Sequence, residues 1–364
     1  MVVIKARKFT RREDLLSIAR RLPLQELAVH LTQWIEPLSP TRAAIVTEQL
    51  RGLVQEDHRD EYVLFGAGDE RVAALVLLHQ QGQRFISIVH AGFVDARTTG
   101  AFSDPLLVSL RNCLRDYCDE RQLPFMQWST EPCEVPKEHE KGSPAANQPR
   151  EAAGVLTPEQ LGFTWLGTLD FLALDFPTSL EGSRPPLAPA SSVRLQPVGP
   201  EEGPLRRQLE DVIASTYQDS LDCPRLEEFR TPAEIIDTYR HSAAYRPDWW
   251  FLVQRSSADG RDVNVGALIL AEHQTRGQDN RSSTAIELVY MGVVPEYRGG
   301  EVGRQIMTRV LQTCRAELAA RLILAVDRSN HYAAELYRSY GMKRLVSESI
   351  WGRRFGPPNG VKEL

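Results

Sequence analysis

The stretch that most constrains the fold of this 364-residue chain is residues 284–304. It begins with a run of branched and aromatic residues that predicts a β-strand, and Pro295 ends that strand. Three glycines follow, which permit backbone conformations closed to other residues, and residues 304–318 then show the apolar spacing of a helix. Because such a turn directs free N–H groups and the positive end of a helix dipole at one point, it predicts a site for phosphate or pyrophosphate.

The glycine spacing excludes two common phosphate-binding turns. No Lys-Ser or Lys-Thr follows the glycines, as a P-loop requires, and the spacing is not the G-x-G-x-x-G of dinucleotide-binding folds. The order of residues instead resembles the motif of the GNAT acyltransferase superfamily, Val-x-Pro-x-Tyr-Arg/Gln-x-x-Gly-x-Gly. The residues that match this motif are Val293, Pro295, Tyr297, Arg298 and Gly303. Glu301 stands where the family usually has its first glycine.

A second motif follows at the separation that the family shows. Residues 322–326 predict a short apolar strand, and residues 330–342 match Asn-x-x-Ala-x-x-Leu-Tyr-x-x-x-Gly-Phe with Met342 in place of Phe. Two motifs in the expected order are far less frequent by chance than either one, so the chain is identified as a member of the GNAT superfamily from both together.

The resemblance implies acetyl-CoA as the co-substrate. Residues 290–293 would pair with the pantetheine arm as a further strand, a backbone N–H near Val293 would polarise the thioester carbonyl, and the glycine turn would hold the pyrophosphate beside the cation of Arg298. A carboxylate directed into the turn would repel pyrophosphate, so Glu301 either faces outward or lowers the affinity. The residues expected to bind the cofactor are Met291, Gly292, Val293, Arg298, Gly299, Gly300, Glu301, Val302, Gly303, Arg304 and Asn330.

Two residues are candidates for the chemistry, each with a structural alternative. The resemblance implies that Glu287 is the general base for the incoming amine, directly or through water, because a protonated amine does not attack a thioester. It implies that Tyr337 protonates the departing thiolate. Alternatively, Glu287 is a solvated carboxylate on a strand face and Tyr337 a core residue with a satisfied hydroxyl. Asn330 is expected to cap the short helix. No His and acid accompany Cys223, so a nucleophilic cysteine is not indicated.

Composition limits the class of protein and its partners. Hydrophobic residues make up 42% of the chain and charged residues 25%, as in ordinary globular proteins. A net charge of −5 argues against a general nucleic-acid binder. No apolar run approaches the ~20 residues that span a bilayer, so a cytoplasmic protein without membrane contact is expected. The five scattered cysteines indicate neither a disulfide framework nor a metal site.

The chain divides into two halves with the same order of predicted elements. We expect a domain at residues 1–175, a proline-bearing linker at 176–191 and a second domain at 192–364. Sliding the sequence by 200 positions places residues 90–94 over 290–294. The fold class is therefore α/β, or α+β with a mixed sheet: two tandem GNAT-like domains, each a mostly antiparallel mixed sheet flanked by helices. This arrangement is similar to that of mycothiol synthase.

The first half lacks the residues that carry the chemistry in the second. At the same offset Thr98 takes the place of Arg298 and Ser103 that of Gly303, while Asp104 would bring a negative charge towards any phosphate. Its other predicted elements include a strand over residues 1–9, a helix over 12–21 and a long polar loop over 131–155. The first half is therefore expected to be a structural or substrate-shaping partner.

The prediction for function is an N-acetyltransferase whose C-terminal domain transfers acetyl from acetyl-CoA to an amine by direct attack. The acceptor is a small-molecule amine, a peptide N-terminus or a lysine, and the sequence names none of them. Two alternatives stay open: an aminoacyl transferase that uses charged tRNA, and a non-catalytic CoA-binding sensor or scaffold. The oligomeric state is not indicated by the sequence.

Overall fold

The computed structural model describes most of the chain and forms two compact units. Within the described part, the first unit runs to Trp165 and includes the chain again from Trp351, and the second is Leu166–Ile350. The described residues are 18–54, 56–68, 72–81, 85–94, 104–132, 156–176, 192–199, 203–225, 245–257, 259–276 and 282–355, with residues 234, 236, 239 and 240.

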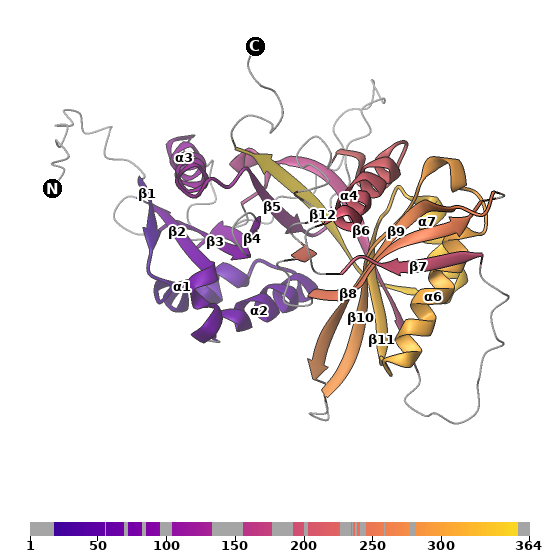
Figure 1. Ribbon diagram of the computed structural model, residues 1–364. Helices are drawn as coiled ribbons and strands as arrows, with labels where there is room; N and C mark the ends of the chain where they lie inside the picture. Colours follow the sequence, from indigo (N-terminus) through magenta and orange to yellow (C-terminus); the bar gives the residue numbers. More distant parts are fainter. Residues whose placement is uncertain are drawn as a thin grey trace, which may run out of the picture. The chain divides into compact units, whose positions relative to one another are not determined.

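The first unit is a mixed sheet with helices on both faces (Figure 1). Its strands lie in the order β1-β2-β3-β4-β5, and only β4 and β5 are parallel. Buried residues of α1 and α2 pack on one face and those of α3 on the other. The elements are β1 (Ile18–Leu22), α1 (Glu26–Ile35), α2 (Pro40–Val54), β2 (Tyr62–Gly68), β3 (Ala74–Gln81), β4 (Phe85–Phe93), α3 (Asp104–Arg121) and β5 (Phe125–Thr130).

The second unit follows the same plan. Its strands lie in the order β12-β6-β11-β10-β9-β8-β7, with β10 and β11 parallel and β6–β11, β10–β9, β9–β8 and β8–β7 antiparallel. The elements are β6 (Thr164–Asp175), β7 (Val193–Pro197), α4 (Pro204–Tyr217), β8 (Tyr245–Ser256), β9 (Asp262–Arg276), β10 (Ser282–Val293), α6 (Val302–Ala316), β11 (Arg321–Asp327), α7 (His331–Ser339) and β12 (Lys343–Arg354). Each unit is thus a mostly antiparallel mixed sheet flanked by helices, as the sequence predicts.

The alternation of side chains along the strands assigns each helix to a face. On β9, Leu268 and Leu270 pack with α6, whereas Ala267 and Ile269 pack with α4. Successive residues of a strand point to opposite faces, so α4 and α6 cover opposite faces of the sheet. Each helix contributes an apolar stripe, and burial of a large aliphatic side chain stabilises the fold by about 1.5–3 kcal/mol.

The two units share an irregularity at the same place. In β4 the register against β3 shifts so that Val89 is an extra residue, and in β10 the register against β9 shifts so that Val289 is one. These residues are 200 positions apart, which is the offset that aligns the two halves of the sequence. A bulge bends its strand and disrupts the local ladder, so both units break their pairing at equivalent points.

Two expectations differ from the structure. The sequence predicts a helix over residues 12–21, but the chain forms β1 there from Ile18, because pairing with β2 satisfies its backbone groups. The expected boundary at residue 175 also differs from the division into units, since β6 pairs with β11 and so joins the second sheet. The predicted strand at 1–9 and almost all of the loop at 131–155 and the linker at 176–191 lie outside the described residues.

A search of the described helices found none that is both long enough and apolar enough to cross a membrane.

The end of β12 completes the core of the first unit, which gives a first prediction. Trp351 is 5% exposed within that core and its indole N–H donates to Thr130 Oγ1 at 3.0 Å. Trp351→Ala should therefore destabilise the first unit by about 3–5 kcal/mol, measured as a lowered melting temperature. Leu345→Ala, on the same strand but 57% exposed, is the control. Equal shifts for both variants would contradict the assignment of Trp351 to this core.

Candidate active site

The candidate site lies where β10 and β11 part. Their parallel pairing runs from Ala285 to Leu288 on β10 and ends just before the bulged residue Val289. Beyond that point residues of both strands line a cavity of about 920 Å³ within the second unit. α4 and the loop after it, the glycine turn, α6 and α7 supply the other walls. The site is therefore a consequence of two strands that separate at a bulge.

The edge of β10 that faces this cavity carries unpaired backbone groups. Val294 donates its N–H to Val265 O, on the side of β9. Neighbouring residues of a strand direct their backbone groups to opposite edges, so the N–H of Val293 points to the cavity side. Met291, two residues earlier, has the same orientation. An extended ligand can therefore pair with this edge as a further strand would.

Gly292 is required by the packing of α4 against this edge. A Cβ at Gly292 would lie 2.7 Å from Thr216 Oγ1 and 2.8 Å from Tyr290 Oη, closer than side chains tolerate. The hydroxyls of Thr216 and Tyr290 are hydrogen-bonded to each other, which holds the end of α4 on the strand. Desolvation raises the pKa of Tyr290, so this phenol stays protonated.

The glycine turn places the start of α6 at the cavity. Gly299 has φ of +72°, in the left-handed region that favours glycine, and Gly300 and Gly303 also line the cavity. Glu301 occupies the N-cap position of α6 without a side-chain cap, and it is exposed. Glu301 and Val302 are not among the described residues that line the cavity. The outward side chain of Glu301 leaves the first N–H groups of the helix open to an anion.

Arg298 makes contacts that the sequence did not indicate. Its guanidinium donates to the carbonyl oxygens of Val293 at 3.0 Å, Thr216 at 2.7 Å, Gln218 at 2.8 Å and Asp219 at 3.2 Å. Three of these carbonyls belong to the end of α4 and the turn after it, where a cation is favoured by the helix dipole. Arg298 therefore joins α4 to the end of β10, and most of its donors are occupied before any ligand binds.

The second motif supplies Asn330 and Tyr337. Asn330 caps α7 by accepting from the N–H of Ala333 at 3.2 Å, which confirms the expected cap. Tyr337 is 6% exposed, lines the cavity, and its hydroxyl has no hydrogen-bond partner among the described residues. Burial, and then the negative charge of Asp222, raise the pKa of this phenol, so it keeps its proton near neutrality.

Glu287 lies one residue before the cavity-lining run of β10. Its Oε2 is 2.6 Å from Nε2 of His273 on β9, and it is not among the described residues that line the cavity. The hydrogen bond to Glu287 raises the pKa of His273. The structure thus brings Tyr337 and the glycine turn to one cavity, but places Glu287 in a pair with His273.

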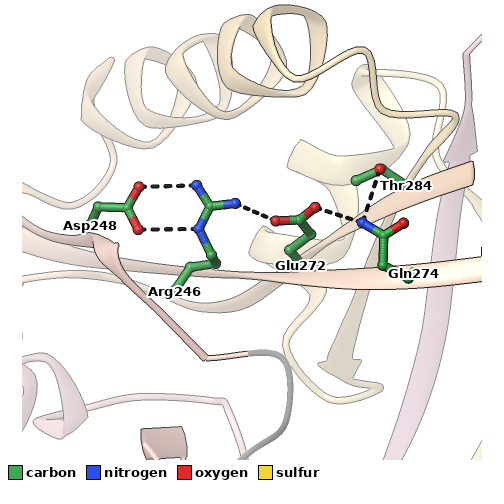
Figure 2. A network of polar contacts seen from close by, with 5 residues as sticks. All are labelled: Arg246, Asp248, Glu272, Gln274 and Thr284. Carbon is green, nitrogen blue, oxygen red and sulfur yellow. Dashed lines mark hydrogen bonds and ion pairs between the residues drawn. The ribbon is translucent and has the colours of Figure 1, made fainter.

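A polar network joins β8, β9 and β10 on the face of the sheet opposite to Glu287 and His273 (Figure 2). Arg246 binds both oxygens of Asp248 and also Glu272, and Gln274 bridges Glu272 at 2.8 Å and Thr284 at 3.4 Å. Glu272 and Gln274 flank His273 in sequence, so they point to the face opposite to His273 and Glu287. The network therefore ties β8, β9 and β10 together without supplying a cation to Glu287.

The loop after α4 lines the cavity between Arg298, which donates to Asp219 O, and the end of β11. Asp222 Oδ1 accepts from the N–H of Asp327 at 3.0 Å, and Asp327 Oδ2 accepts from the N–H of Cys223 at 3.2 Å. Desolvation and then the charges of Asp222 and Asp327 raise the pKa of the Cys223 thiol, so it is not a thiolate nucleophile. Neither sequence motif contains Asp222, and no local signal links it to Asp327 of β11, 105 positions away.

Comparison with known proteins assigns the region that holds the cavity to a protein family. The model of the Acetyltransferase (GNAT) family matches residues 214–342. Residues 214–342 form a GNAT domain. The domain contains every described residue that lines the cavity except Leu169 of β6.

Individual relatives of this chain are distant. A protein of Bacillus subtilis (strain 168) named "Putative ribosomal protein bS18-alanine N-acetyltransferase" is 35% identical over 57 residues, which cover 16% of this chain and 38% of that protein. A GCN5-related N-acetyltransferase from Sphaerobacter thermophilus aligns with 18% identity and a TM-score of 0.47, covering 94% of this chain and 96% of its own. A tandem GNAT protein from the clavulanic acid biosynthesis pathway aligns with 12% identity and a TM-score of 0.42, covering 94% and 100%.

Within the first unit, a side chain occupies the position equivalent to the cavity of the GNAT domain. There β4 and β5 pair in parallel up to Ile88, and the bulged residue Val89 follows. Arg42, 4% exposed, donates to the carbonyls of Val89 on β4 and Ser129 on β5. His90 lies beside it, and burial lowers the pKa of His90 to about 4, so it is neutral. A side chain of α2 thus bridges the two strands where the GNAT domain leaves a cavity.

The carbonyl contacts of Arg298 predict a structural effect of substitution. Lys keeps the charge but lacks the planar set of donors, so Arg298→Lys should lower the free energy of unfolding by about 1 kcal/mol, since the residue is exposed. The same substitution should lower the affinities for CoA and for phosphate-free pantetheine, measured by calorimetry, to a similar extent. Arg309→Lys on α6 is the matched control. Unchanged stability with a loss confined to CoA would instead assign Arg298 to the pyrophosphate.

Proposed function

We propose that the GNAT domain is an N-acetyltransferase that uses acetyl-CoA and an amine. The observation that carries this proposal is that the unpaired edge of β10, the glycine turn before α6 and the free hydroxyl of Tyr337 all open into one cavity. A strand edge suits the amides of pantetheine, a helix start suits the pyrophosphate, and a phenol suits the departing sulfur. The residues of the glycine turn, Val293 and Asn330 are the proposed cofactor contacts.

The proposed reaction is direct transfer. The amine nitrogen attacks the thioester carbonyl, whose oxygen is polarised by the N–H of Val293. The N–C bond forms, the C–S bond breaks, and the thiolate takes a proton from Tyr337. The attacking amine is neutral, so nitrogen carries one excess proton after the N–C bond forms. That proton restores Tyr337, and the products are an amide and the free thiol of CoA. An acceptor that enters as an ammonium ion releases one further proton before the attack.

The acceptor class is proposed as a primary amine of a small molecule, a peptide N-terminus or a lysine. The relative from Bacillus subtilis carries the name of an alanine N-acetyltransferase, which makes a peptide N-terminus one candidate here. Release of free thiol from acetyl-CoA should be measured with ethylamine, spermidine and alaninamide. Thiol release with any of the three supports the proposal, and CoA binding without thiol release would favour a sensor.

Tyr337 gives a prediction for the chemical step. Tyr337→Phe keeps the ring and its packing but removes the proton, so kcat should fall by about 10²-fold or more while CoA affinity stays nearly constant. Tyr340→Phe, whose hydroxyl bonds Arg304 O at 2.9 Å on the far side of α7, is the matched control. A Tyr337→Phe protein that folds, binds CoA and turns over at the parent rate would remove Tyr337 from the mechanism.

The difference between the two units predicts one CoA site per chain. Because Arg42 bridges the parting strands of the first unit, calorimetry should give a stoichiometry near one. Gly300→Glu adds a negative charge at the turn, where a Cβ would meet only the carbonyl oxygen of Tyr297 at 4.0 Å, so it should weaken the binding of CoA about tenfold or more. Gly203→Glu, where a Cβ would meet nothing within 4 Å and which lies outside the cavity, is the control. Two equal CoA sites per chain would contradict the predicted stoichiometry.

A further inference from the structure

We propose that Asp222 binds the ammonium group of the acceptor inside the cavity and takes a proton from it. This inference rests on the proposed function of the GNAT domain and names a residue that neither motif contains. Asp222 lines the cavity from the loop after α4, and the residue is exposed. A cation that binds in this part of the cavity therefore meets a carboxylate.

Asp222 lines the same cavity as two phenols, those of Tyr337 on α7 and Tyr290 on β10. Its negative charge contributes to the raised pKa of both phenols. Tyr337 is 6% exposed, and its hydroxyl has no hydrogen-bond partner among the described residues, although the hydroxyl of a buried tyrosine normally has one. An unpartnered donor and a carboxylate that line one cavity are the arrangement expected where a ligand completes the contacts.

Asp222 is held in position by its neighbours. Its Oδ1 accepts the N–H of Asp327 at 3.0 Å, and Asn330 also hydrogen-bonds to it. Asp327 is 3% exposed and is itself engaged with Cys223 and Ser329, so its carboxylate is occupied by backbone and hydroxyl donors. Of these two acids, Asp222 is therefore the one that a ligand can reach.

The cavity carries groups of both signs. The glycine turn, the start of α6 and Arg304 favour the phosphates of CoA. Asp222, which is held against the end of β11, favours a cation. This carboxylate fits an acceptor that arrives as an ammonium ion. The ammonium gives a proton to Asp222, the neutral amine forms the N–C bond, and the C–S bond breaks with protonation of sulfur by Tyr337. The excess proton left on nitrogen restores Tyr337, and Asp222 releases its proton to solvent.

The test uses Asp222→Asn in the full chain. Asparagine keeps an oxygen to accept from Asp327 N–H, so the loop stays anchored, but the charge is lost. For ethylamine, spermidine or alaninamide, whichever the parent acetylates, the KM should rise about tenfold or more, as expected for a lost charge-assisted contact. For trifluoroethylamine, which is neutral at neutral pH, the ratio of variant to parent KM should stay near one. CoA affinity and melting temperature should not change.

Asp211→Asn makes the same charge change on the exposed face of α4 and is the matched control. An unchanged KM for the ammonium acceptors in Asp222→Asn, or a tenfold rise in Glu287→Gln instead, would overturn the inference while leaving the proposed function intact. Equal losses for charged and neutral amines, or a loss of CoA affinity, would show a structural role for Asp222 and overturn it as well. A parent protein that binds CoA but acetylates none of the amines would refute the proposed function and the inference together.

Discussion

The separation of β10 from β11 at Val289 is the constraint on which the rest of the site depends. One extra residue in β10 ends the parallel ladder at Leu288 and leaves the edge beyond it without a strand partner. Unpaired backbone groups inside a protein are costly unless something binds them, so an open edge at this place indicates a ligand. Helices on both faces of the sheet then close the gap into a cavity.

The first unit shows a second arrangement of the same scaffold. It has the same strand order and an equivalent bulge, but Arg42 donates to the carbonyls of both strands where they part. Satisfying those groups internally removes the reason for an open site. The two units therefore solve one problem of unpaired backbone in two ways, with an internal guanidinium in one and a cavity in the other.

Arg298 and Asp222 hold the two ends of the loop that follows α4 against the cavity of the GNAT domain. Arg298 holds the end of α4 against β10 through carbonyl oxygens, and the loop that follows α4 carries Asp222 to the start of α7. The same loop therefore depends on contacts at both of its ends. Tyr337 lines the cavity, and its hydroxyl has no hydrogen-bond partner among the described residues. Such a hydroxyl is available to a ligand.

The sequence by itself determined the order of the described elements from α2 onward, the glycine turn before α6 and the cap at Asn330, because these follow from periodicity and local backbone chemistry. It also placed Tyr337 correctly on its helix. Only the tertiary structure decided that β6 joins the second sheet, that Arg298 bonds carbonyls and that Glu287 pairs with His273. It alone brought Asp222 to Asp327, across 105 residues. Such partners come from distant elements, and no local pattern records which strands and loops will meet.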